Sequence, residues 1–293
     1  MDPAKMNDKV TLEAESEVSV RRLRPSRAGG HTHLCAEHFK KWRREAYPGE
    51  RLKTPPWRER WLYLVDIVHH MWRTGYTPKE LGWTVLVLIL KGTTKTRGIE
   101  LIETLWKVVE ALIDTRLQAS LQMHVVLHRF RSIRGMGTDI MELNLSKELA
   151  IIYQPPFFLV FLDLCKAYET VDQERILITL GYGVGPHLYG ILETFWNHQQ
   201  VVPINNGFHR PEFNATRGTT QVGLVSLMIF NVVVDNVIRT WLDMIMEDQR
   251  VAHDGLGETN GRCLGVLYAN NGMVGSQEAD WLHHSMNVLV ELF

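Results

Sequence analysis

Apolar residues recur along this chain with two periods, one typical of helices and the other of strands. A spacing of three or four residues predicts helices over 57–72, 100–122, 139–152 and 224–246. Residues 173–198 have the same spacing, interrupted by glycines and a proline over 181–186. Short apolar runs predict buried strands at 84–90 and 157–162.

Turn residues divide the remaining segments. Asn and Gly accept the positive φ of tight turns, so Asn205-Asn206-Gly207 predicts a hairpin within 200–217. Asn270-Asn271-Gly272 predicts a second hairpin, between strands at 264–268 and 273–275, before a last helix from about residue 277. This order of elements predicts an α+β fold, with helices packed on a small, mostly antiparallel sheet.

Two stretches lack a regular apolar pattern. Residues 1–30 have poor periodicity and a run of arginine, proline and glycine, which predicts an unstructured leader. Residues 92–98 are polar and glycine-bounded, which predicts a loop before the helix that begins at Glu100.

The composition is that of a globular protein with a real core. The chain has 293 residues, 45% of them hydrophobic and 22% charged, which excludes a disordered, collagenous or coiled-coil protein. The longest nearly continuous apolar run, Trp83–Leu90, has 8 residues with Thr84 included, too few to cross a bilayer, so no membrane partner is expected. Three scattered cysteines and no evident secretory signal predict an intracellular protein, cytoplasmic or nuclear.

Charge is unevenly distributed behind a net value of −1. Residues 21–60 carry 12 basic and 4 acidic side chains, whereas 151–293 carry 7 and 15. The basic segment predicts weak, salt-sensitive nucleic-acid binding, and a solvated tail is the alternative. A cluster of His31, His33, Cys35 and His38 could bind zinc, but its spacing matches no standard zinc motif.

The segment Phe161–Asp172 reads F-L-D-L-C-K-A-Y-E-T-V-D and places a carboxylate, Asp163, at the end of a buried strand. A carboxylate in that position needs a partner, and a hard cation is one candidate. The alternative is that Asp163 caps the next helix.

This segment resembles the first palm motif of reverse transcriptases, in which a metal-binding Asp precedes Ala-Tyr or Ala-Phe. Residues 217–231, with Asp235 beyond them, resemble the second motif, and Tyr268–Asn271 stands where the family has Tyr-Ala-Asp-Asp. Leu90–Gly92 and Arg97–Ile99 resemble the fingers motif. The match covers roughly residues 81–293 and is closest to non-LTR retrotransposon and group II intron enzymes.

The resemblance implies a right-hand polymerase fold with fingers and palm but no thumb. It implies a basic, partly disordered segment at 1–55, fingers at 56–156 and a palm with a small antiparallel sheet at 157–293. The implied activity is that of an RNA-directed DNA polymerase, with an RNA template, a DNA primer, dNTPs and two Mg²⁺ ions.

Residue roles also follow from the resemblance. It implies that Asp163, Asn270 and Asn271 occupy the catalytic positions, and that Asp163, Leu164 and Asn270 are the metal ligands. The nucleotide-binding positions that it implies are Lys91, Arg97, Tyr168 and Gln221.

The motifs depart from the family at positions that matter for chemistry. Asn270 replaces the metal-binding Asp, and an amide brings no charge to a Mg²⁺ pair. Val222 replaces a Gly, Leu227 a Pro and Glu169 an Asp. We therefore expect a decayed retroelement copy with impaired catalysis. The alternative is a non-catalytic fragment that binds nucleic acid or protein.

Overall fold

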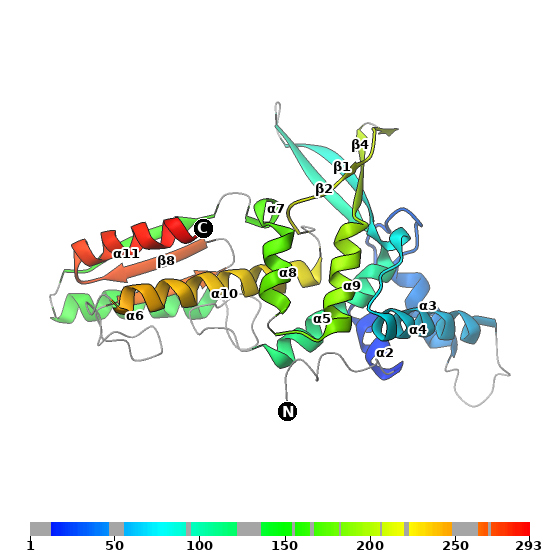
Figure 1. The fold of residues 1–293 in the computed structure, drawn as a ribbon, viewed down its shortest axis with the longest axis horizontal. Helices are drawn as coiled ribbons and strands as arrows, with labels where there is room; N and C mark the ends of the chain where they lie inside the picture. Colours follow the sequence, from blue (N-terminus) through cyan, green and yellow to red (C-terminus); the bar gives the residue numbers. More distant parts are fainter. Residues whose placement is uncertain are drawn as a thin grey trace. The chain divides into compact units, whose positions relative to one another are not determined.

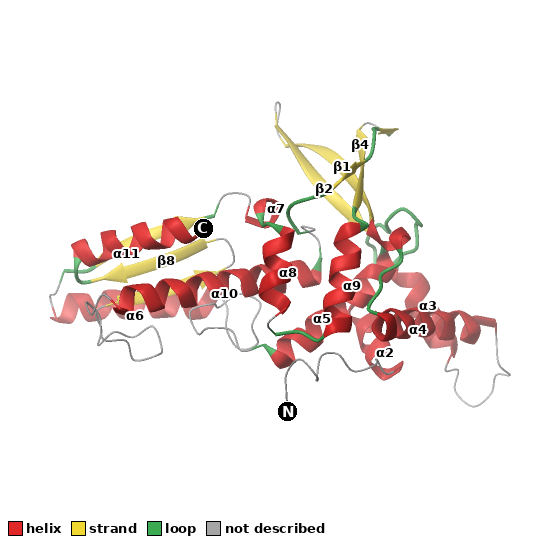
Figure 2. Cartoon of the chain, in the orientation of Figure 1, coloured by secondary structure: helices red, strands yellow, loops and turns green. Residues whose placement is uncertain are grey.

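Two compact units make up the chain, and each combines two separate stretches of sequence. The first contains Met1–Leu121 and Tyr168–Ser226, and the second contains Gln122–Ala167 and Leu227–Phe293. The computed structural model describes residues 13–46, 56–91, 95–121, 136–153, 156–164, 167–181, 183–205, 207–219, 223–247, 263–268 and 271–293. Both units contain helices and strands (Figure 1 and Figure 2), which confirms the expected α+β class.

The first unit contains most of the helices and the larger sheet. Its helices are α2 (Glu13–Arg22), α3 (Ala36–Ala46), α4 (Pro56–Thr74), α5 (Thr104–Ser120), α8 (Gln173–Gly181) and α9 (Pro186–Asn197), with a 3₁₀ helix η1 (Lys79–Gly82). Its strands are β1 (Trp83–Lys91), β2 (Lys95–Ile102), β4 (Gln200–Asn205), β5 (Phe208–His209) and β6 (Phe213–Asn214). The short helix α7 (Ala167–Thr170) begins at the boundary between the units.

The N-terminal helices pack into a core, which corrects the expectation of an unstructured leader over residues 1–30. Helix α2 buries Ser16 and Ser19 as well as Val20, so serines on its buried face hide the apolar periodicity. Residues 1–12 lie outside the described residues. Side chains of α2, α3, α4 and α5, with Leu23 beside them, form one buried cluster: Val20, Leu23, Ala36, Phe39, Trp61, Leu64, Val65 and Val108.

Two arginine contacts hold α2 on α5. The Arg22 Nη2 atom lies 2.7 Å from the Asp114 Oδ2 atom, and Arg22 also donates to the Ala111 carbonyl oxygen. The Arg116 Nη2 atom lies 2.8 Å from the Glu15 Oε2 atom, and its guanidinium carbon lies 4.8 Å from the centre of the Trp72 ring. Because Asp114 and Arg116 are buried, each contact pairs a charge that is largely shielded from water.

Strand β1 is central to the larger sheet. It pairs antiparallel with β2 and parallel with β4, while β5 and β6 add antiparallel pairs to β4. The pairing is therefore mostly antiparallel, as expected, but it is divided between two sheets rather than one. The parallel pair joins residues 200–204 to the first unit, which combines two stretches of sequence. The division into fingers and palm stays a prediction.

The β1–β2 hairpin corrects two predicted boundaries. Residues from Lys95 to Ile102 pair with β1, so the predicted loop over 92–98 is shorter than expected. For the same reason the following helix begins at Thr104 rather than at Glu100. Tertiary pairing with an apolar strand outweighs the local helical spacing here.

The second unit is a three-stranded antiparallel sheet with long helices. Its strands run in the order β3 (Phe158–Asp163), β8 (Asn271–Ser276) and β7 (Cys263–Tyr268). Helix α11 (Ala279–Leu292) packs on β8, and the Trp241 indole of α10 donates to the Ser285 carbonyl oxygen of α11. The remaining helices are α6 (Met136–Tyr153) and α10 (Leu224–Glu247), which starts in the first unit.

Helix α10 bears on the membrane prediction. Its segment Leu224–Ile245 is long and apolar enough to cross a bilayer by length and composition, with a mean hydropathy of 1.4. The 8-residue run was too strict a test, because a membrane span tolerates scattered polar residues. Half of the most apolar stretch is buried in the protein, as in a core helix, so length and composition are weak evidence for a span.

Because Arg22 pairs with a buried carboxylate, we expect its loss to destabilise the protein more than the loss of the adjacent Arg21. Replacing Arg22→Gln removes the charged partner of buried Asp114, leaving the Gln118 amide, and is expected to lower the free energy of unfolding by about 1–3 kcal/mol. Replacing Arg21→Gln removes only an exposed pair with Glu17, which is expected to cost less than about 0.5 kcal/mol. Urea denaturation of both variants measures the difference. Equal losses would contradict this account of how α2 is held.

Candidate functional site

The pairing of β3 with β8 brings two motif residues together. Asp163 ends β3 and lies directly opposite Asn271, the first residue of β8, and both side chains are exposed. Residues opposite each other on antiparallel strands have Cβ atoms about 4.5–5.5 Å apart, close enough to share one ligand. Half-buried Leu164 follows directly.

The strand that follows the third motif begins earlier than predicted, at Asn271. Tyr268 pairs with Asn271, so residues 269–270 connect β7 to β8. Asn271 and Gly272 therefore belong to a strand rather than to the turn, because their backbones pair on both sides. Asn270 itself lies outside the described residues, and its role as a metal ligand stays a prediction.

Phe161 is a neighbour that the motif comparison did not single out. Side chains alternate between the faces of a strand, so Phe161 and Asp163 lie on the same face of β3. The Phe161 side chain is 70% exposed although it belongs to a strand predicted to be buried. Strand alternation alone implies that one face of β3 could be exposed. The sequence does not show which face it is, because residues 158–162 are all apolar.

The start of the second motif lies against the end of the first. Within the first unit, the Gly218 amide donates to the Val171 carbonyl oxygen at 2.8 Å, and the Thr219 amide donates to the Tyr168 carbonyl oxygen at 2.7 Å. Gly218 has a φ of +81°, and a Cβ atom there would lie 2.8 Å from the Glu169 carbonyl oxygen. Only glycine fits such a backbone and such an approach without strain.

Gln173 reinforces this junction from the first turn of α8. Its side chain is 9% exposed, and its Nε2 atom donates to the Gly218 carbonyl oxygen at 3.0 Å and to the Gln199 Oε1 atom at 3.3 Å. Motif comparison missed Gln173 and Gln199. Nothing in the sequence marks them, because a glutamine in a first helical turn is ordinarily exposed.

The structure describes the backbone positions of Lys91, Arg97 and Tyr168, three of the four predicted nucleotide-binding residues. Lys91 ends β1, opposite Lys95, and Arg97 lies on β2 opposite Ile89, so both belong to the β1–β2 hairpin. Tyr168 lies in α7 at the junction with Gly218. Gln221 and Val222 lie outside the described residues. Lys91, Arg97 and Tyr168 belong to the first unit, and Asp163 and Asn271 belong to the second.

The histidine–cysteine cluster has other contacts. The Cys35 Sγ atom lies 3.0 Å from the His38 Nδ1 atom, which also accepts the Cys35 amide, and the His31 ring packs on Trp83. Within the part of the chain that the structure describes, no three His, Cys, Asp or Glu side chains group closely enough to hold a metal ion.

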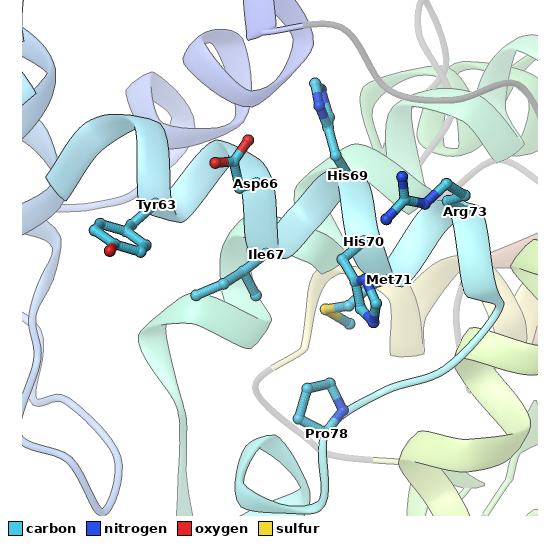
Figure 3. A pocket seen from close by; sticks show the side chains of 8 residues that line it. All are labelled: Tyr63, Asp66, Ile67, His69, His70, Met71, Arg73 and Pro78. Carbon is cyan, nitrogen blue, oxygen red and sulfur yellow. The ribbon is translucent and has the colours of Figure 1, made fainter. Parts of the chain in front are cut away.

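A surface pocket of about 540 Å³ lies along α4 and is separate from the motif residues. In Figure 3, His70 and Met71 lie on the side of α4 that faces Pro78, whereas His69 points the other way. Because its polar side chains do not converge, the pocket suggests no particular ligand. Its lining residues are Tyr63, Asp66, Ile67, His69, His70, Met71, Arg73 and Pro78.

Comparison with known proteins assigns no family to the chain. No protein-family model matches the chain, and no curated protein matches it.

Adding one methyl group at Gly218 is expected to destabilise the protein strongly. Gly207 has a similar φ of +80° but open space around its missing Cβ, so Gly207→Ala tests backbone strain alone. That variant is expected to lose about 1–2 kcal/mol of unfolding free energy. Gly218→Ala adds a clash with backbone and is expected to lose about 1–3 kcal/mol more. Thermal and urea unfolding compare the two, and equal losses would remove the steric argument.

Proposed function

We propose that the chain is a reverse transcriptase-like domain, derived from a retroelement, whose catalytic metal site is impaired. The observation that carries the proposal is the register of Asp163 opposite Asn271. Asp163 and Asn271 are 108 positions apart in sequence, and they lie opposite each other on the paired strands β3 and β8. Polymerase chemistry requires such an arrangement, because ligands from both motifs must reach the same ions.

The contact between Tyr168–Val171 and Gly218–Thr219 supports the same reading. These residues come from the segments proposed as the first and second motifs. Two backbone hydrogen bonds join them, and the Gln173 side chain donates a third bond to the Gly218 carbonyl oxygen. In the proposed function this junction would place Tyr168 beside the segment that contains Gln221. Lys91 and Arg97 would bind the triphosphate, where a guanidinium offers a bidentate fork.

The donor atoms at the end of β3 and β8 fit Mg²⁺ only in part. Asp163 offers a charged carboxylate, whereas Asn271 offers a neutral amide oxygen, as Asn270 would. Bound Mg²⁺ ions would activate the attacking hydroxyl and neutralise the leaving pyrophosphate. With one carboxylate in place of two, Asp163 would hold the ions less tightly, and loss of one such group costs a factor of about 10²–10³ in rate.

Primer extension tests the proposed impairment. The unmodified chain is expected to give no measurable extension of a radiolabelled DNA primer on an RNA template with Mg²⁺ or Mn²⁺. Asn270→Asp alone is expected to strengthen Mn²⁺ binding without restoring normal extension, because Val222, where reverse transcriptases have Gly, would crowd the template in the proposed function. Calorimetry measures the metal binding.

Asp163→Ala serves as the blank in both measurements. Extension by the unmodified chain that disappears in Asp163→Ala would overturn the impairment. Full extension after Asn270→Asp would show that the third motif is the single defect. Unchanged Mn²⁺ binding in both Asn270→Asp and Asp163→Ala would overturn the metal site itself.

Non-catalytic nucleic-acid binding is the second candidate, and the basic N-terminal segment favours it. Three of its arginines already contact carboxylates, since Arg21 and Arg43 pair with Glu17 and Arg22 pairs with Asp114. Exposed arginines in the loop after α2, Arg24 and Arg27, offer a surface for phosphate. Any such surface is therefore smaller than the charge count over residues 21–60 predicts.

The double variant Arg24→Gln/Arg27→Gln is expected to weaken binding to single-stranded RNA. The slope of the logarithm of affinity against the logarithm of salt concentration is expected to fall by about 1–2, one for each lost phosphate contact. Arg21→Gln is the matched control, because its guanidinium already pairs with Glu17. Fluorescence anisotropy at several salt concentrations gives both values. Equal effects in the variant and the control would contradict the assigned surface.

A further inference from the structure

Two exposed phenylalanines lie on the outer strands of the larger sheet. Phe208 begins β5 and Phe213 begins β6, and their side chains are 73% and 50% exposed. Both strands pair with β4, which lies beside β1 in the sheet (Figure 1). Single exposed apolar side chains are common, but a group of them on one face of a sheet is typical of a binding surface.

The register of β4 places both rings on one face. Phe208 is opposite Asn205, and Phe213 is opposite Val201. Asn205 and Val201 are four residues apart on β4, so their side chains and those of the residues opposite them lie on the same face of the sheet. The two phenylalanines are therefore separated by about 13 Å along the strand direction.

An extra residue in the outer chain segment brings Phe213 to this face. Continued without a break, the register of β5 would bring Glu212 opposite Val201. Phe213 takes that place instead, so residues 211–212 contain one extra residue, as in a β-bulge. Bulges re-aim side chains, and this one puts an aromatic ring where a carboxylate would otherwise lie.

Arg210 lies between the two rings and is exposed. Its amide donates to the Pro203 carbonyl oxygen at 2.8 Å, which continues the register and puts Arg210 opposite Pro203. Leu90 of β1 is 72% exposed and shares this face, because Leu86, four residues before it, pairs with Pro203. The name Phe–Arg–Phe row is used below for the three residues of the outer strands: Phe208, Arg210 and Phe213.

The two chain segments that form this sheet are basic. Residues 83–102 and 200–217 contain five basic residues and two acidic ones: Lys91, Lys95, Arg97, Arg210, Arg217, Glu100 and Glu212. The whole chain, by contrast, has a net charge of −1. A polyanion is the partner whose charge this sheet complements.

We propose that the Phe–Arg–Phe row binds single-stranded nucleic acid, with bases stacked on Phe208 and Phe213 and a phosphate paired with Arg210. A single strand matches both properties of the surface. Each nucleotide supplies one base that can stack on an aromatic ring and one phosphate that can pair with a guanidinium. The distance between the rings lets them stack on separate bases of one strand, whereas a duplex keeps its bases stacked inside the helix.

The proposal goes beyond the proposed function, since it requires neither a metal ion nor Asp163. It also differs from the phosphate surface at Arg24 and Arg27, which supplies charge but no ring for stacking. A strand bound to the row would be held whether or not the metal site is impaired.

Fluorescence anisotropy of the full chain with a labelled single strand of mixed sequence, without Mg²⁺ or dNTPs, tests the proposal. The double variant Phe208→Leu/Phe213→Leu keeps apolar side chains but removes both rings, and its dissociation constant is expected to rise at least about tenfold. Phe208→Tyr/Phe213→Tyr keeps both rings and is expected to stay within about twofold of the unmodified chain. Ile89→Ala is the matched control, because Ile89 is 47% exposed on the opposite face of the same sheet.

Two further comparisons separate stacking from charge. Arg210→Gln is expected to lower the slope of the logarithm of affinity against the logarithm of salt concentration by about 0.7, the value for one phosphate contact on a single strand. The leucine variant is expected to leave this slope unchanged. A duplex of the same sequence is expected to bind the leucine variant and the unmodified chain equally, because its bases are not free to stack on protein.

Unchanged affinity for the single strand in the leucine variant would overturn the proposal, and so would an equal loss with the duplex. A dimer of the unmodified chain that the leucine variant dissolves, seen by sedimentation equilibrium without strand binding, would overturn it and assign the face to a second copy. Because the assay needs no catalysis, its failure leaves the primer-extension proposal standing, and the reverse also holds.

Ultraviolet cross-linking of the labelled strand to the unmodified chain decides the point should the leucine variant fail to fold. Cross-linked nucleotides are expected at Phe208 or Phe213, and cross-links confined to other segments of the chain would overturn the proposal.

Discussion

Buried ionisable side chains on and beside α5 hold the first unit together. Glu103, Glu110, Asp114 and Arg116 are each less than 10% exposed, and each has a partner from another segment. Glu103 accepts two hydrogen bonds from Thr32, and the other three contact α10 or α2. Buried charges are costly without partners, so these contacts specify one arrangement of the N-terminal helices and α10.

This arrangement changes the meaning of the basic N-terminal segment. From composition alone it is a cationic tail that could contact nucleic acid. In the structure, part of its charge is directed inward to Glu17 and Asp114, and its apolar residues belong to the core. Arginine serves both roles with one side chain, because a guanidinium can pair with a buried carboxylate as readily as with phosphate. Charge counting alone cannot separate the two.

The sequence singled out the motif residues but not the residues that hold them in position. Asp163 and Asn271 were prominent in the sequence because they stand at recognisable positions. Two buried glutamines were not: Gln173, which donates to Gly218, and Gln199, which accepts from Gln173. Residues that position a motif are defined by their contacts, and contacts between distant segments leave no spacing signal in one sequence. The close approach at Gly218 is an exception, since a glycine at a fixed motif position already points to restricted backbone space.

The sequence by itself determined the α+β class and many of the main elements, but it did not predict α2, α3 or β2. Periodicity located α4, α6, α8, α9, α10 and β1, because their apolar spacing is regular. It failed for α2, whose buried face contains serines, and for residues 100–102, whose helical spacing yields to pairing with β1. Only the tertiary structure decided that Asp163 faces Asn271, that β1 pairs with β4, and that Glu110 accepts the Leu224 amide of α10. Each of these joins residues far apart in sequence, where register and burial, rather than local preference, set the outcome.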